Sequence, residues 1–98
     1  MQFYISRAVR QKLHEKHQVS DKEIFECFFN RTHSFLTDTR EDHLTDPITK
    51  WFISETDLGR QLKVCFIERG VESIEIKTAY EPSTTNAINV YYKIAKEC

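Results

Sequence analysis

Residues 50–80 read KWFISETDLGRQLKVCFIERGVESIEIKTAY, and this stretch decides the fold. Apolar side chains recur at every second position through much of it, which is the period of a β-strand. Gly59 and Gly70 fall late in short polar turns, as is typical of hairpin connections. The stretch therefore predicts an antiparallel meander with strands at residues 50–55, 61–67 and 73–79.

The alternation also assigns the faces of the predicted sheet. In the third strand, one face is expected to carry Ile74, Ile76 and Thr78. The opposite face is expected to carry Glu75 and Lys77. In the first strand, Trp51 and Phe52 are adjacent and must point to opposite faces, so we expect one in the core and the other more exposed, where a partner could contact it.

Two helices are predicted ahead of the meander. Ser20 and Glu23 have the spacing of a capping box, in which each side chain accepts a hydrogen bond from the other residue's backbone N–H. The helix that follows should end near residue 30, and its predicted buried face consists of Ile24, Phe25 and Phe28. An earlier helix is predicted at residues 7–17, with Ser6 as its cap and a short strand at residues 2–6 before it.

The remaining segments carry weaker patterns. Residues 34–38 are predicted to form a short strand, and the polar residues 39–47 an exposed loop. The segment 83–96 fits a helical stripe and a strand alternation equally well, and the Ser and Thr residues after Pro82 favour the helix. The predicted order is strand, helix, helix, antiparallel meander and a short C-terminal element, which is an α+β fold.

The composition suits one domain spanning residues 1–98. A net charge of −1 argues against a surface that coats nucleic acid generally, although it leaves room for a local basic cleft. The chain has no run of about 18 apolar residues and no apolar signal segment near its start, so we expect no membrane contact. Three widely spaced cysteines suit free thiols in a reducing cytoplasm.

Three short strings, taken in this order and spacing, resemble the BrnT-type toxins of the RelE-like ribonuclease superfamily. Residues 15–20 (EKHQVS) are similar to that family's Lys-His-Gly-Val-Ser, with Gln18 in place of the glycine. Residues 57–64 (DLGRQLKV) are similar to its Gly-Arg hairpin turn leading into an apolar strand. Residues 74–80 (IEIKTAY) lie at the place of its Ile-Ser-Ala-Arg strand end, with Tyr80 where the arginine is expected.

The resemblance covers about residues 12–79 and implies a function. It implies the toxin of a bacterial type II toxin–antitoxin pair, a metal-independent ribonuclease that cleaves RNA through its 2′-hydroxyl and uses no cofactor. RNA and a cognate antitoxin protein would be its partners, with a homodimer left open, and its location would be cytoplasmic.

The matching strings and their neighbours supply a candidate site. Metal-free RNA cleavage needs a general base, a general acid and positive charge near the phosphorane; His and Tyr can move protons, while Arg and Lys stabilise oxyanions. The catalytic candidates are His17, Arg60, Lys77 and Tyr80, and the RNA-binding candidates are Lys16 and Lys63. We expect the catalytic candidates to converge on one concave surface, and Lys63 and Lys77 to meet across paired strands if the register allows.

Each catalytic candidate also has a purely structural interpretation. His17 could cap carbonyls at the end of its helix. Arg60 could be an ordinary exposed turn residue, and Lys77 a strand lysine that faces solvent. Tyr80 could serve packing at a strand end.

A metal site is not predicted. His14 and His17 are three apart and would share one helix face. The conceivable further ligands are Cys27, His33 and His43. No established zinc motif is present, and the acidic segment 38–46 lacks the glycine and spacing of a calcium loop.

Two other functions stay open. A non-catalytic protein- or RNA-binding module would keep the fold without the clustered cations. A hydrolase of ADP-ribose or another nucleotide is the third alternative, and no constellation of residues calls for it; the sequence contains no glycine-rich phosphate loop.

Overall fold

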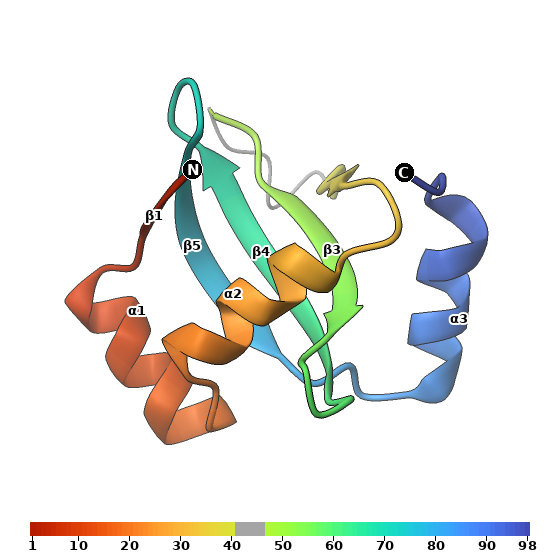
Figure 1. Ribbon diagram of the computed structural model, residues 1–98, viewed down its shortest axis with the longest axis horizontal. Helices are drawn as coiled ribbons and strands as arrows, with labels where there is room; N and C mark the ends of the chain where they lie inside the picture. The colour runs from red at the N-terminus through yellow and green to blue at the C-terminus, as the bar shows by residue number, and fades with distance from the viewer. Residues whose placement is uncertain (41–46) are drawn as a thin grey trace.

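The computed structural model describes residues 1–40 and 47–98. Within these ranges the chain has an α+β fold built around one sheet (Figure 1). Its strands are β1 (Gln2–Tyr4), β2 (Leu36–Thr37), β3 (Lys50–Glu55), β4 (Gln61–Glu68) and β5 (Ser73–Tyr80). Its helices are α1 (Arg7–Lys12), the π-helix η1 (Leu13–His17), α2 (Asp21–Asn30) and α3 (Thr85–Ile94). None of these helices is long and apolar enough to cross a bilayer.

The sheet has the strand order β1-β5-β4-β3-β2. Strands β3, β4 and β5 are the predicted meander, in which each strand pairs antiparallel with the next. Strand β1 pairs in parallel with the outer edge of β5. The helices α1, η1 and α2 connect β1 to β2, which lies at the opposite edge of the described sheet. The expected order of elements is confirmed.

The two helices before the meander begin as the sequence predicts. The Ser6 hydroxyl accepts a hydrogen bond from the Val9 N–H, and Ser20 and Glu23 form the complete capping box. The first helix differs in its second half, where it widens into η1. This π-helix ends at His17, and the capping residue after it, Gln18, has a φ of 50°, in the left-handed region that glycine adopts at least cost. Gln18 is the residue that replaces glycine in the resembling string.

The core lies between α2 and the sheet. Ile24 and Cys27 of α2 are fully buried, and the Phe28 ring packs 4.7 Å from that of Phe52, centroid to centroid. The prediction was wrong for Phe25, which is 42% exposed. Residues 24, 27 and 28 share one helical face at i, i+3 and i+4 spacing, whereas residue 25 points about 100° away from residue 24.

Adjacent residues of β3 identify the two layers. Phe52 packs against α2, while Trp51 packs on the other face against Tyr91 of α3, with ring centroids 5.5 Å apart. Figure 1 shows α3 on the far side of β3 from α1. Within the predicted segment 83–96, Thr85–Ile94 forms the helix that the capping residues favour: Thr84 caps it, and Tyr91 is fully buried.

Two predicted segments differ from the structure or fall outside it. The strand predicted at 34–38 is limited to β2, because only Leu36 and Thr37 pair with β3. Residues 32 and 34 instead bond to the segment after α3, where Ser34 N–H donates to the Lys96 carbonyl. Most of the loop predicted at 39–47 lies outside the described residues.

Candidate functional site

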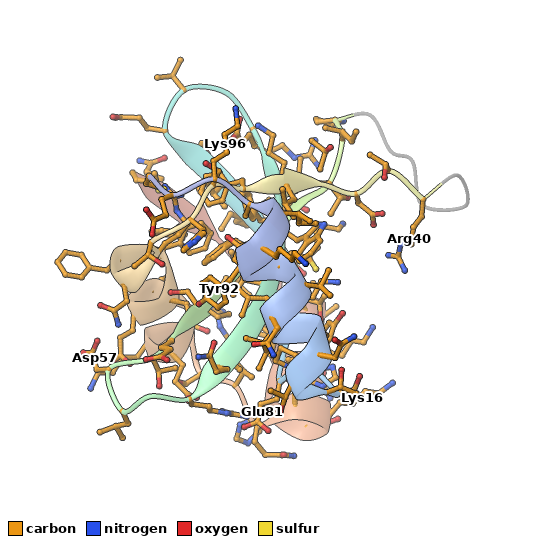
Figure 2. The ribbon with its side chains drawn as sticks, turned by 90° about the vertical axis from the view of Figure 1, so that its right-hand side faces the viewer. Lys16, Arg40, Asp57, Glu81, Tyr92 and Lys96 are labelled. Carbon is orange, nitrogen blue, oxygen red and sulfur yellow. The ribbon has the colours of Figure 1, made fainter. Side chains whose placement is uncertain are left out.

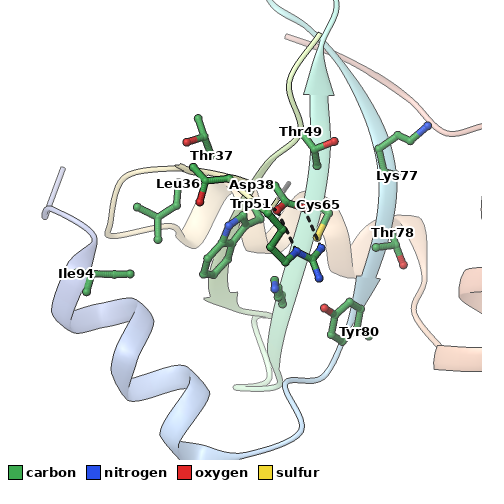
Figure 3. Close-up of a pocket in the computed structure, with 13 residues that line it drawn as sticks. Leu36, Thr37, Asp38, Thr49, Trp51, Cys65, Lys77, Thr78, Tyr80 and Ile94 are labelled. Carbon is green, nitrogen blue, oxygen red and sulfur yellow. Dashed lines mark hydrogen bonds and ion pairs between the residues drawn. The ribbon is translucent and has the colours of Figure 1, made fainter. Parts of the chain in front are cut away.

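A cavity of about 770 Å³ opens on the face of the sheet opposite α2 (Figure 3). We call it the sheet-face cavity. Trp51 of β3, Lys63 of β4 and Tyr80 of β5 line it, and Ile94 of α3 closes one side. Arg40, from the segment after β2, and Lys77 of β5 also line it. The described elements that build this cavity are therefore β3, β4, β5 and α3, together with the chain near β2.

Strand register brings the lining residues together. Cys65 of β4 lies opposite Trp51 on one side and Thr78 on the other, while Lys63 lies opposite Tyr80. Directly opposed residues of antiparallel strands have their side chains on the same face. The residues between them, such as Val64 and Ala79, point into the core and are fully buried.

A β-bulge in β5 determines where Tyr80 points. Phe66 pairs with Ile76 but Cys65 pairs with Thr78, so Lys77 is an extra residue with no partner in the β4 register. An extra residue reverses the alternation of faces beyond it. Ile74 and Ile76 face the core, yet Thr78 and Tyr80 face the cavity, although all four have even numbers.

This bulge corrects two expectations. Thr78 does not share a face with Ile74 and Ile76, because the bulge lies between them. Lys63 and Lys77 are not cross-strand partners, because Lys63 pairs with Tyr80. Lys77 still lines the same cavity as Lys63, and its ammonium lies 3.7 Å from a carboxylate oxygen of Glu75.

The sheet-face cavity is positively charged although the whole chain carries a net charge of −1. Among the described residues, its lining includes Arg40, Lys63 and Lys77 and one carboxylate, Asp38. That carboxylate accepts hydrogen bonds from Arg40 Nε at 3.0 Å and Nη2 at 2.9 Å. In the described part of the lining, three cations and one acid give a net positive charge, which favours an anionic ligand.

Lys63 connects the two aromatic residues of the cavity. Its ammonium lies 4.3 Å from the centroid of the Trp51 ring and 5.9 Å from that of Tyr80. Cation–π contacts at partly exposed sites contribute about 0.5–1 kcal/mol. The contact is weak enough for a phosphate to draw the ammonium away from the rings.

A smaller cavity of about 290 Å³ adjoins the first at Tyr80, which lines both. We call it the junction cavity, because it lies where η1 meets the ends of β4 and β5. Its wall includes Lys16, His17, Arg60 and Glu81, and Figure 2 shows Lys16 and Glu81 at the same end of the molecule. The rings of His17 and Tyr80 lie 5.6 Å apart, centroid to centroid.

Arg60 is engaged by the protein itself. It donates from Nη2 to the His17 carbonyl at 2.9 Å and from Nη1 to the Gln18 carbonyl at 2.8 Å. It also pairs with Glu23 at 2.9 Å and with Glu81 at 2.7 Å. These four bonds use four of the five guanidinium N–H donors, so Arg60 holds the end of η1 against α2 and the end of β5.

The two partners of the Arg60–Glu23 pair hold each other in the charged state. Burial raises the pKa of Glu23, but hydrogen bonds from the Ser20 N–H and from Arg60 outweigh it, and the net result is a lowered pKa. Burial likewise opposes the charge of Arg60, yet its bonds to Glu81 and Glu23 raise the pKa of the guanidinium. Both groups therefore stay ionised near neutral pH.

The predicted site residues divide between the two cavities. His17, Arg60 and Lys16 line the junction cavity, whereas Lys63 and Lys77 line the sheet-face cavity. Tyr80 belongs to both, so the catalytic candidates form two adjoining groups and do not share one hollow. Sequence reasoning missed Arg40, which lies beside a polar segment with no local pattern to distinguish it.

Neither metal ligation nor thiol chemistry stands out. Among the described residues, no three His, Cys, Asp or Glu side chains gather as a metal site, and His43 lies outside those residues. Burial raises the pKa of the Cys27 thiol to about 12. Burial also raises the pKa of Cys65, so the one thiol in the sheet-face cavity stays protonated.

Comparison with known proteins identifies the fold. No protein-family model and no curated protein matches the sequence. Among solved structures, the chain is similar to the crystal structure of the Brucella abortus ribonuclease toxin BrnT, with a TM-score of 0.64 and 20% sequence identity. The match covers 86% of this chain and 99% of that one. The chain thus has a BrnT-like fold.

Proposed function

We propose that this chain is the toxin of a type II toxin–antitoxin pair and cleaves RNA without a metal through the 2′-hydroxyl. The single observation that carries the proposal is the sheet-face cavity: three cations and Tyr80 gathered on one face of a chain that is otherwise slightly acidic. The similarity in fold to a ribonuclease toxin supports the same conclusion.

The reaction divides into proton transfer and charge stabilisation. The 2′-oxygen of the RNA attacks the adjacent phosphorus and loses its proton, while the departing 5′-oxygen gains one. The phosphorane between these steps carries extra negative charge, which nearby cations stabilise. A site for this reaction needs a general acid for the departing oxygen, with a side chain or water as the base, and positive charge beside the phosphorane.

In our proposal the sheet-face cavity meets both needs. The Tyr80 hydroxyl donates its proton to the departing 5′-oxygen, water takes up the proton of the 2′-hydroxyl and later returns one to Tyr80, and Lys63 and Lys77 contact the phosphate. Arg40 adds a third cation at the rim. Lys16 and His17 contact the RNA where it passes from Tyr80 into the junction cavity, while Arg60 keeps the junction in place without contacting the phosphate.

We further propose that a cognate antitoxin neutralises the chain by covering the sheet-face cavity. Strand β2 lies at the edge of the described sheet and contributes Leu36 and Thr37 to the cavity wall. A helix or strand from the antitoxin that docks there would close the cavity to RNA.

A non-catalytic binding module is the second candidate, and one observation favours it. The described lining of the sheet-face cavity contains no histidine, and its carboxylate Asp38 is held by Arg40. The described lining then offers no obvious side chain to act as a general base beside Tyr80. Such a module would bind RNA in the same cavity and leave it intact.

One experiment separates the two candidates. The purified protein is incubated with single-stranded RNA in excess chelator, beside the same sequence with 2′-O-methyl groups. We expect the RNA to yield fragments with 2′,3′-cyclic phosphate ends and the methylated strand to stay intact. Tyr80→Phe should slow cleavage by about 10²-fold or more, and Lys63→Ala/Lys77→Ala should slow it as well.

Lys22→Ala is the matched control, because Lys22 lies on α2 with its side chain 85% exposed, outside both cavities. It should leave cleavage unchanged. Cleavage that the chelator abolishes, or that persists in all cavity variants, would reject the proposed chemistry. RNA that is bound but never cut would establish the binding module.

A further inference from the structure

Trp51 is the only tryptophan of the chain, and its ring borders the sheet-face cavity. On one side it rests against Tyr91 of α3, at 5.5 Å between ring centroids, which fixes its position. On the cavity side the ammonium of Lys63 lies 4.3 Å from the centroid of the ring. The end of a flexible side chain therefore lies over this aromatic surface.

The wall of this cavity has two chemical halves. Trp51 and Ile94 form an apolar, aromatic half, and Figure 3 shows them close to Leu36. Lys63, Lys77 and Arg40 form the cationic half. A ligand that matches both halves has a flat apolar ring joined to a phosphate, which describes a nucleotide.

We propose that Trp51 is a stacking platform for one unpaired base of the RNA, and that the sheet-face cavity therefore selects single strands. The inference rests on the proposed function, since it takes RNA as the ligand of this cavity. It adds the residue that binds the base and the kind of RNA that can enter.

Lys63 makes the exchange feasible. In the free protein its ammonium covers the Trp51 ring; when RNA enters, the ammonium turns to a phosphate and the base takes its place on the ring. A charge-assisted bond to phosphate and a stacked base replace one weak cation–π contact. The same side chain thus uncovers the platform and binds the backbone.

Base stacking on the ring excludes duplex RNA. In an A-form helix every base is already stacked between its neighbours, and its deep major groove is closed to side chains. An unpaired base can turn outward and lie on an aromatic ring whatever its identity, because every base has a π-face. The cavity should therefore discriminate between single-stranded and duplex RNA more strongly than between different base sequences.

Tryptophan fluorescence of the unaltered protein tests the inference directly, because Trp51 is the only emitter of its kind. The probe is a short single-stranded 2′-O-methyl oligonucleotide, which cannot be cleaved through its own 2′-oxygen. We expect saturable quenching of the emission. An abasic strand with the same number of phosphates, and a blunt duplex of the same sequence, should bind without comparable quenching.

Binding measured by fluorescence anisotropy of a labelled oligonucleotide supplies the second readout. Trp51→Leu should weaken single-strand binding by roughly ten- to a hundredfold, while Trp51→Phe should retain most of the affinity. Both variants should bind the abasic strand as the unaltered protein does. Tyr4→Leu is the control for loss of an exposed aromatic residue outside the cavity.

The outcomes separate this inference from the proposed function. RNA that is cleaved without quenching of Trp51, or with equal quenching by the abasic strand, overturns the inference and leaves the function standing. Stronger quenching by the strand with bases than by the abasic strand, in a protein that never cuts RNA, supports the inference and rejects the proposed nuclease activity. Failure of any single strand to bind overturns the inference as well.

Discussion

Arg60 illustrates how a residue's role is decided by its contacts. Its place in a Gly-Arg turn suggested contact with phosphate, but in the structure it donates to two carbonyls and pairs with two carboxylates. Only 25% of its side chain is exposed. A phosphate could accept from more than one guanidinium N–H only by displacing bonds that hold η1 to α2 and β5.

The first prediction concerns this arginine. Arg60→Ala should lower the free energy of unfolding by about 2–3 kcal/mol, because it leaves charged and carbonyl partners unsatisfied. Arg60→Lys should lower the free energy of unfolding by less, since the ammonium of lysine keeps the positive charge. Chemical denaturation measures both. Arg69→Ala removes an exposed ion pair with Glu75 and should cost at most about 1 kcal/mol; an equal loss at both positions would contradict the assignment.

The second prediction concerns the pH dependence of Glu23. Its pKa is below the ordinary 4.5 in the folded chain, so ionised Glu23 stabilises the fold above that pH. The contribution is lost as the pH falls through 4.5 and then through the lower folded pKa. The stability difference between the unaltered protein and Glu23→Gln should be largest near neutrality and shrink in acid. A difference that stays constant with pH would contradict this account.

At the scale of elements, the start of α2 joins two networks through Glu23. Its Oε1 accepts from the Ser20 N–H at 3.1 Å, and its Oε2 accepts from Arg60 at 2.9 Å. One carboxylate therefore caps a helix and anchors the hairpin turn.

A double-mutant cycle tests this sharing as a third prediction. Ser20→Ala should cost about 1 kcal/mol as loss of an N-cap. Combined with Arg60→Ala, the two losses should not add, because both variants alter the position of Glu23. Thermal or denaturant unfolding of the four proteins gives the coupling free energy; strict additivity would show that the two networks are independent.

The elements also show what local pattern can and cannot predict. The capping box, the meander and the opposed faces of Trp51 and Phe52 follow from residue types at fixed spacing, and the structure confirms them. The bulge at Lys77 was not predicted, because the expected faces continued the alternation through Thr78, although two adjacent polar residues, Lys77 and Thr78, interrupt the pattern of IEIKTAY. It arises from pairing with β4, and it alone brings Tyr80 to the cavity face.

At the scale of the whole molecule, charge is distributed unevenly. The net charge is −1, yet Arg40, Lys63 and Lys77 meet at one cavity from distant parts of the sequence. No count over the chain could predict this, since the gathering depends on sheet order. The net charge argued against a surface that binds nucleic acid generally, but it could not predict where the cations gather in the folded chain.

The fourth prediction follows from those three cations. Binding of a non-cleavable single strand should weaken with salt, with a slope of about −2 in log affinity against log salt concentration if three phosphates are neutralised. Lys63→Ala/Lys77→Ala should flatten the slope, and Lys22→Ala should not. A titration series at several salt concentrations measures it, and a slope near zero would place the RNA elsewhere.

The central claim is that the sheet-face cavity makes this chain an RNA-cleaving toxin. It is tested most directly by inducible expression in bacteria of the unaltered chain beside a Lys63→Ala/Lys77→Ala variant of equal abundance, with growth and bulk RNA integrity followed together. We expect growth arrest with fragmented RNA from the unaltered chain and neither from the variant. Normal growth and intact RNA from abundant, folded, unaltered protein would contradict the claim.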